Sequence, residues 1–214
     1  MLRPGKHLIT VLLLANASQA LATDLSAVIT GGDGQPLPNA VVTIATDSAA
    51  SRQNAPARIA DQTIDQRSET FLPLVTIVRK GGRVNFANSD PTTHQVFSFS
   101  PVKQFELTLG RGESKGIGFE NTGVAAIGCN IHDKMIAYVF VADSPYTALT
   151  GEDGRAVIHD VPPGRYSVQV WHPQQRPGSA MPSTELELSG DIARWEASLK
   201  ILPPRKTRSH GGNY

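Results

Sequence analysis

The segment Gly128-Cys129-Asn130-Ile131-His132-Asp133-Lys134-Met135 places a cysteine, a histidine and a methionine at a C-x2-H-x2-M spacing. Apolar, strand-like segments flank it at Val124–Gly128 and Ile136–Val141. His94 stands 35 positions before the cysteine, just ahead of another stretch with strand-like alternation. The sequence therefore predicts that three potential metal ligands share one loop between adjacent strands, with His94 supplied as a fourth by a facing strand.

The chemistry of these four side chains favours copper. A soft thiolate, two imidazoles and a thioether are donors that suit copper in both oxidation states. The Cys129 thiolate and the imidazoles of His94 and His132 would form a trigonal plane, and Met135 would be a weak axial ligand that tunes the redox potential. Taken singly, each residue has an ordinary explanation, such as a buried cysteine or a core methionine. Their joint occurrence favours a metal site, and the methionine favours copper over zinc.

Composition narrows the possible functions. The 214 residues include 20 Lys and Arg against 19 Asp and Glu, a net charge of +1, which excludes a uniformly basic nucleic-acid-binding surface. A hydrophobic fraction of 40% with 18% charged residues is typical of a globular chain. The single cysteine excludes a disulfide framework, an iron–sulfur cluster and a copper site with two bridging thiolates. No second histidine cluster accompanies the first, so we expect an electron carrier and not a copper enzyme.

The first segment reads as a targeting signal. Arg3 and Lys6 precede an apolar run, Leu8–Ala15, and Ala20-Leu21-Ala22 matches a signal-peptidase site. The run is too short to span a bilayer as a mature helix, although an uncleaved anchor is the alternative. We therefore expect residues 1–22 to be a signal peptide and the mature protein to be periplasmic, with no integral membrane span.

The rest of the chain divides into parts that differ in composition and in the density of strand signals, and the structured parts are all predicted to be β-structure. Strand and turn signals occupy residues 23–47 and 145–202, and a small, polar stretch separates the first of these from a strand-dense region at 60–144. Within that region, Val75–Val78 and Arg83–Phe86 around Lys80-Gly81-Gly82 predict a hairpin. Short strands at regular spacing favour a sandwich or a barrel. Residues 203–214 have no core residue and predict a flexible tail.

The two outer parts resemble one known family. GQPLPNAVV at Gly34–Val42 and TGEDGRAVIHDVPPGRYSVQVW at Thr150–Trp171 are similar to a carboxypeptidase regulatory-like, transthyretin-type sandwich. In that family the second block follows the first after a short gap, so the resemblance implies that the middle region is inserted into a small antiparallel sandwich. The alternative is two unrelated pieces in tandem, in which the first two strands would pair with the middle region.

The middle region resembles another family. VRKGGRVNFANSDPTTHQVFSFS at Val78–Ser100 and FENTGVAAIGCNIHDKMIAYVFV at Phe119–Val141 are similar to a cupredoxin of the plastocyanin class, with the ligand spacing of amicyanin. The resemblance implies a Greek-key sandwich, the four ligands named above, Asn88 as a brace between ligand loops, and His132 as the exit for electrons. With the outer sandwich, the chain resembles the cupredoxin-like proteins of the methylamine utilisation type. Asp133 and Lys134 replace the apolar residues and proline that amicyanin carries next to the second histidine.

The sequence thus predicts a periplasmic type 1 (blue) copper electron-transfer protein that exchanges electrons with protein redox partners. Two other functions remain open. A periplasmic copper chaperone or buffer would use the same ligands for tight Cu(I) binding and metal transfer. A non-redox binding module would use the outer sandwich to hold a partner, with the inner one as a metal-free spacer.

Overall fold

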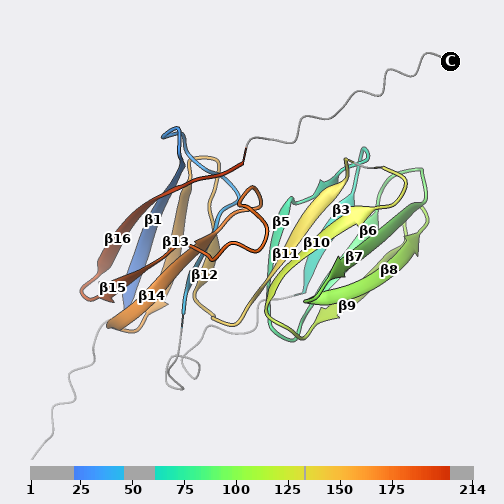
Figure 1. Cartoon of the computed structure of the whole chain (residues 1–214). Helices are drawn as coiled ribbons and strands as arrows, with labels where there is room; N and C mark the ends of the chain where they lie inside the picture. The colour runs from blue at the N-terminus through green and yellow to red at the C-terminus, as the bar shows by residue number, and fades with distance from the viewer. Residues whose placement is uncertain (1–21, 46–60, 133, 203–214) are drawn as a thin grey trace, which may run out of the picture.

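The computed structural model describes residues 22–45, 61–132 and 134–202, and within these ranges the regular elements are β-strands (Figure 1). The strands are β1 (Thr23–Gly31), β2 (Val41–Ile44), β3 (Gln62–Gln66), β4 (Phe71–Leu72), β5 (Val75–Arg79), β6 (Gly82–Asn88), β7 (His94–Ser100), β8 (Lys103–Leu109), β9 (Ser114–Phe119), β10 (Gly123–Cys129), β11 (Ile136–Ala142), β12 (Thr147–Leu149), β13 (Arg155–Val161), β14 (Gly164–Trp171), β15 (Ser183–Leu188) and β16 (Ile192–Leu199). The expected signal peptide up to residue 21, most of the polar stretch, Asp133 and the expected tail lie outside the described residues. No helix in the described ranges could cross a bilayer.

Strands β3–β11 form a two-sheet sandwich, here called the inner sandwich. One sheet has the order β5-β11-β10-β7-β8 and the other the order β4-β3-β6-β9. The chain crosses repeatedly between the two sheets, which gives the Greek-key connectivity that the sequence predicted. Alternate residues of the strands point inward, as along β10, where Ala125, Ile127 and Cys129 are buried. The core of this sandwich therefore extends directly to the cysteine.

The predicted hairpin at residues 75–86 is wrong. Strand β5 pairs with β11 in the five-stranded sheet, whereas β6 pairs with β3 and β9 in the other sheet. The connecting residues bond to both sheets, because the Lys80 amide donates to the Ala142 carbonyl at 2.9 Å and the Gly81 amide to the Phe119 carbonyl at 2.7 Å. Gly81 has φ 79°, which favours glycine. The Lys-Gly-Gly turn therefore moves the chain from one sheet to the other.

The remaining strands form an outer sandwich from both ends of the chain. Its sheets have the orders β13-β1-β16 and β12-β2-β14-β15, so β1 and β2 pair with strands that follow the inner sandwich. In the order of the chain, the strands of the inner sandwich therefore lie between β2 and β12. The division of the chain into an inserted domain and a discontinuous outer domain stays a prediction. In β1 every second residue from Thr23 to Gly31 is buried, and Leu25, Ala27 and Ile29 belong to a second hydrophobic core. The transthyretin-type family resemblance of this sandwich stays a prediction.

One strand pair departs from the expected antiparallel arrangement. Strand β16 runs parallel to β1, from Asp24 beside Ile192 to Gly31 beside Leu199. The other pairs in the outer sandwich are antiparallel. Strand β16 enters from β15, which lies in the opposite sheet, so no tight hairpin with a neighbour imposes the antiparallel direction.

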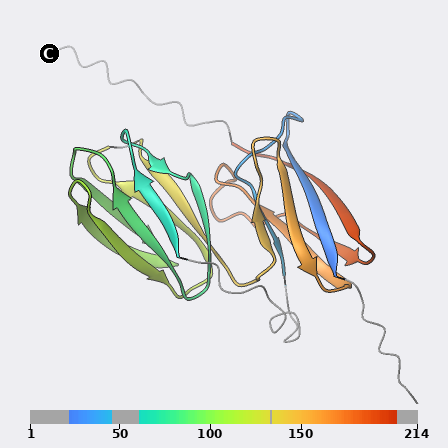
Figure 2. The ribbon, with the colours of Figure 1, turned by 180° about the vertical axis from the view of Figure 1, so that it is seen from behind.

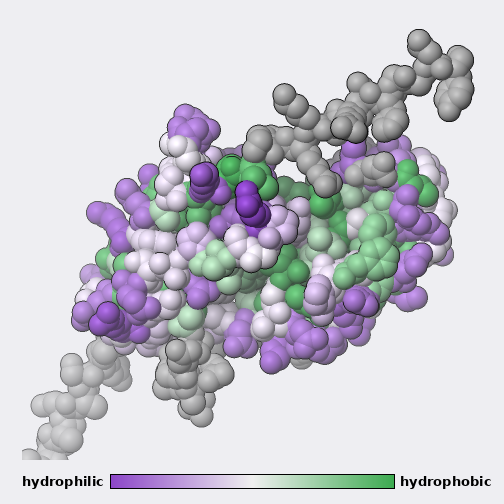
Figure 3. All heavy atoms as spheres, viewed as in Figure 1, coloured by the Kyte–Doolittle hydropathy of each residue, from purple (hydrophilic) through white to green (hydrophobic). Residues whose placement is uncertain are grey.

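The two sandwiches lie side by side and share a third hydrophobic cluster (Figures 1 and 2). Val75 and Phe140 of the inner sandwich pack there with Val41 of the outer one, and partly buried Tyr138 and Trp171 join them. This contact covers the β5–β11 part of the five-stranded sheet. Hydrophobic side chains remain at the surface of the face that Figure 3 views. Among the described residues, Phe99 is a hydrophobic side chain that is 74% exposed.

Candidate metal site

His94 and Cys129 meet at one end of the inner sandwich because their strands are neighbours. His94 begins β7 and Cys129 ends β10, and these antiparallel strands place Cys129 opposite Val96. Both side chains are buried, and the His94 Nδ1 atom lies 3.6 Å from the Cys129 Sγ atom. His94 was expected from a facing strand, and this is corrected: β7 adjoins β10 in the same sheet. Adjacency in one sheet brings the two residues this close.

His132 completes a compact cluster from the loop between β10 and β11. One ligand atom each from His94, Cys129 and His132 lies within 4.8 Å of the others, and the two imidazole centroids are 5.2 Å apart. The Nδ1 atom of His132 is buried and has no hydrogen-bond partner among the described residues. A buried polar atom without a hydrogen-bond partner costs free energy, because it has lost its contact with water. Binding of a metal ion to this atom would remove that cost. The residues present therefore fit a metal of the soft, nitrogen- and sulfur-binding class.

Met135 lies at the end of the same loop. The residue is 3% exposed and belongs to the hydrophobic core that includes Cys129. Its backbone amide donates to the His132 carbonyl at 3.0 Å, so the loop closes in a tight turn before β11. Ligation by Met135 stays a prediction that rests on the residue type and on this burial.

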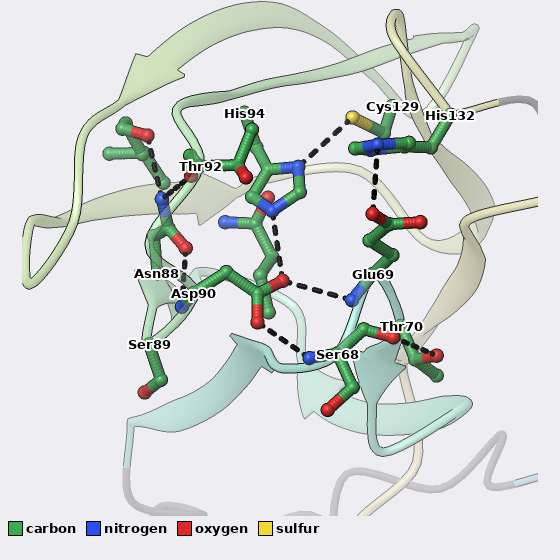
Figure 4. A network of polar contacts seen from close by, with 12 residues as sticks. Ser68, Glu69, Thr70, Asn88, Ser89, Asp90, Thr92, His94, Cys129 and His132 are labelled. Carbon is green, nitrogen blue, oxygen red and sulfur yellow. Dashed lines mark hydrogen bonds and ion pairs between the residues drawn. The ribbon is translucent and has the colours of Figure 1, made fainter.

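Asp90 holds the far side of the His94 ring (Figure 4). Its Oδ2 atom lies 3.0 Å from the His94 Nε2 atom and accepts a 2.9 Å hydrogen bond from the Glu69 amide. Its Oδ1 atom accepts from the Ser68 amide at 2.6 Å. Burial by itself would raise the pKa of the Asp90 carboxyl, but the hydrogen bonds from Glu69, Ser68 and His94 outweigh it and lower the pKa. An ionised Asp90 only accepts, so it favours the His94 tautomer that carries its proton on Nε2 and leaves the Nδ1 lone pair toward the cysteine.

Glu69 holds the corresponding position on the second imidazole. It lies in the tight turn between β3 and β4, where Ser68 and Glu69 have φ of 51° and 54°. Its Oε1 atom lies 3.5 Å from the His132 Nε2 atom, and the side chains are 64% and 24% exposed. The expected solvent edge of His132 is therefore partly occupied by a carboxylate.

Asn88 ties the loop that precedes His94 to the β8–β9 connection. Its buried amide nitrogen donates to the Thr92 carbonyl at 2.8 Å and to the Leu109 carbonyl at 2.9 Å. Its side-chain oxygen accepts from the Asp90 amide at 2.9 Å. These contacts all lie on the His94 side of the site, and a role for Asn88 in bracing the cysteine loop stays a prediction.

The carboxylates of Asp90 and Glu69 are the residues that sequence reasoning missed. Asp90 precedes His94 by four positions, a local signal that could have been used because a histidine ligand commonly donates its distal N–H to a carboxylate. Glu69 has no such signal, since it is 63 positions from His132 and reaches it only after the sheets assemble.

Two other histidines take local structural roles. His172 is buried, with its Nε2 atom 3.0 Å from the Pro38 carbonyl, and its Nδ1 atom accepts from the Gln174 amide at 3.2 Å. His159 is exposed and contacts Asp24 at 2.8 Å. Neither belongs to the metal cluster.

Comparisons with known proteins match solved structures only. A scan against protein-family models and a search of curated protein sequences found no match. A purple cupredoxin from Nitrosopumilus maritimus is 22% identical, covers 38% of this chain and 100% of its own, and has a TM-score of 0.36. A reduced Cu(I) form of an amicyanin variant is 20% identical over 47% of this chain and 98% of its own, with a TM-score of 0.36. A copper-containing nitrite reductase from Thermus scotoductus SA-01 is 21% identical over 54% of this chain and 28% of its own, with a TM-score of 0.37.

These structural neighbours are copper proteins, at low identity and partial coverage. Similarity at this level says nothing about the chemistry of this chain. What the site can do follows from its own donors.

Proposed function

We propose that this protein is a periplasmic electron carrier in which His94, Cys129, His132 and Met135 would hold one type 1 copper. The observation that carries the proposal is the His94–Cys129–His132 cluster, in which His94 and Cys129 are buried and the buried Nδ1 atom of half-buried His132 has no hydrogen-bond partner among the described residues. Copper bound there would supply a one-electron couple between Cu(I) and Cu(II). The partners would be proteins that donate and accept electrons, and not nucleic acids.

The surroundings of the cluster suit fast electron exchange. His94, Cys129 and Met135 are nearly inaccessible to solvent, so the core keeps water away from the ligands. Asp90 orients His94 through a hydrogen bond from the distal nitrogen, and the backbone of two adjacent strands sets the separation of His94 and Cys129. A site held in place by its own scaffold changes little when its charge changes. His132, with 24% of its side chain exposed, offers the route to a partner.

The test is a visible and EPR spectrum of the mature protein with one equivalent of Cu(II). We expect an intense blue thiolate-to-copper band and narrow hyperfine splitting, both lost in Cys129→Ser. A Met135→Leu variant keeps the core apolar and should retain the colour with a changed reduction potential. A Cys129→Ser protein that kept its colour and its reversible redox couple would overturn the proposal.

Metal transfer distinguishes a copper chaperone or buffer from an electron carrier. A chaperone would bind Cu(I) tightly, pass it to an acceptor and exchange electrons slowly. A metal-free binding module would be indicated if the protein stayed colourless and copper changed neither its stability nor its binding to a partner. A metal that binds only the folded state stabilises it by about 2.7 kcal/mol at a hundred times its Kd, so thermal unfolding with and without copper distinguishes this case.

A further inference from the structure

The β3–β4 turn at residues 67–70 is linked to both imidazoles of the site. It reaches the His132 Nε2 atom directly through Glu69, and it reaches the His94 Nε2 atom only through Asp90. Arg67 and Thr70 close the turn through paired backbone hydrogen bonds of 2.9 and 3.1 Å. The turn projects two backbone amides toward Asp90 and one carboxylate toward His132 (Figure 4).

Asp90 is the junction of this arrangement. Asp90 as a whole is 6% exposed, and its carboxylate oxygens lie within 3.0 Å of the Ser68 amide nitrogen, the Glu69 amide nitrogen and the His94 Nε2 atom. The same carboxylate therefore orients His94 and anchors the turn that carries Glu69. A second link, from the Ser89 amide to the Gln66 carbonyl at 3.0 Å, joins the two segments just beside it.

We infer that Asp90 and the 67–70 turn form one clasp that positions both histidine ligands together, with Glu69 as the positioning residue for His132. Asp90 acts on His94 directly and on His132 through the turn. Each imidazole has a carboxylate oxygen near its Nε2 atom, at 3.0 Å for His94 and 3.5 Å for His132. The Nδ1 atom of His94 lies 3.6 Å from the Cys129 Sγ atom, and the Nδ1 atom of His132 is buried without a hydrogen-bond partner among the described residues. This inference rests on the proposed metal site, but the clasp is present in the protein without metal.

The clasp makes the two ligands thermodynamically coupled. Removal of the Glu69 carboxylate disturbs His132 only. Loss of the Asp90 charge disturbs His94 and also releases the turn, so that Glu69 no longer reaches His132. Residues that share one hydrogen-bond network give non-additive effects in a double-mutant cycle.

The decisive measurement is long-range ¹H–¹⁵N NMR of the histidine rings in the metal-free full-length mature protein. In the unsubstituted protein, we expect His94 and His132 to show the Nε2–H tautomer. Glu69→Ala should change His132 and leave His94 as it is, and Glu69→Gln, whose amide oxygen still accepts, should restore the wild-type pattern in part. Asp90→Asn should change both rings. Asp153→Asn is the matched control, since Asp153 belongs to the outer sandwich and contacts Arg155 but neither the 67–70 turn nor an imidazole.

Zinc affinity supplies a second readout that needs no redox chemistry. Loss of a carboxylate behind a histidine ligand costs about 10- to 100-fold in metal affinity. We expect Glu69→Ala to weaken Zn²⁺ binding about tenfold in the wild-type background and to have little further effect in Asp90→Asn. Additive losses of Zn²⁺ affinity in the double variant would overturn the coupling. A His132 tautomer that is unchanged in Asp90→Asn would overturn it as well. A wild-type tautomer pattern in a protein that never forms a blue copper site would remove the proposed function and keep the clasp.

Discussion

Tyr138 and Trp171 meet edge to face across the boundary between the two sandwiches, with ring centroids 5.7 Å apart and an interplanar angle of 63°. Phe140 approaches the same indole, with a centroid distance of 5.8 Å. Tyr138 lies on β11, the strand that follows the Met135 loop, and Trp171 ends β14 of the outer sandwich. The outer sandwich therefore supports the sheet that carries the candidate site.

Replacement of the indole tests this support. We expect Trp171→Ala to lower the free energy of unfolding by about 2 kcal/mol, because a large aromatic side chain is removed from a packed interface. Urea denaturation followed by far-UV circular dichroism measures the loss. Trp171→Phe keeps a ring and should cost less. A change below about 0.5 kcal/mol for Trp171→Ala, within the range of ordinary surface substitutions, would show that the boundary contributes little stability.

A glycine in the turn between β12 and β13 of the outer sandwich allows a sharper test of packing. Gly154 has φ 71°, and a Cβ atom there would collide with the Ile29 carbonyl oxygen and lie 3.0 Å from the Leu37 amide nitrogen. Backbone atoms cannot move aside as a flexible side chain can. We expect Gly154→Ala to cost about 2–5 kcal/mol, from the left-handed conformation and from overpacking together.

Gly34 provides the matched control for that substitution. It has φ 79°, and a Cβ atom there would meet nothing within 4 Å. Gly34→Ala should therefore cost only the conformational part, about 1–2 kcal/mol. Equal losses of thermal stability in the two variants would contradict the steric explanation.

The hydrogen bonds of Asn88 predict a stability effect near the candidate site. Asn88→Ala removes two donated bonds and one accepted bond in a buried setting and leaves the Thr92 and Leu109 carbonyls without this partner. We expect a loss of about 2–3 kcal/mol, since buried groups without partners retain their desolvation cost. Thermal unfolding of the metal-free protein measures it. An unchanged midpoint would show that water or a local shift replaces the amide.

His172 predicts a pH dependence of stability. Burial lowers its pKa from 6.5, opposed by its hydrogen bond to the Pro38 carbonyl. The unfolded chain therefore binds a proton at a higher pH than the folded protein does, and stability is lost as the pH falls below about 6.5. Urea unfolding at a series of pH values should show a smaller decline for His172→Gln than for the unsubstituted protein. Parallel curves for the two proteins would rule out a contribution from His172.

Local patterns predicted most of the strands and failed where a strand has an unusual composition. Strand β3, Gln62–Gln66, has a polar sequence in which only Ile64 and Gln66 are buried. Strand β9 contains Gly116 and Gly118, which read locally as turn residues. The Arg83 and Asn85 side chains of β6 lie so close to Gly116 that a Cβ atom there would meet them within 3 Å. Gly116 therefore lacks a side chain because strand β6 lies beside it, and the sequence did not predict that β6 and β9 are neighbours.

The sequence by itself determined that the chain is β-structure and that Cys129, His132 and Met135 share one short loop, because alternation and ligand spacing are local properties. Only the tertiary structure decided which strand borders which, and hence that His94 adjoins Cys129 in one sheet and that the Lys80-Gly81-Gly82 turn joins two sheets. It also brought Glu69 to His132. Which strands pair depends on how the residues of both cores pack together in the folded chain. A local sequence pattern holds no information about that packing.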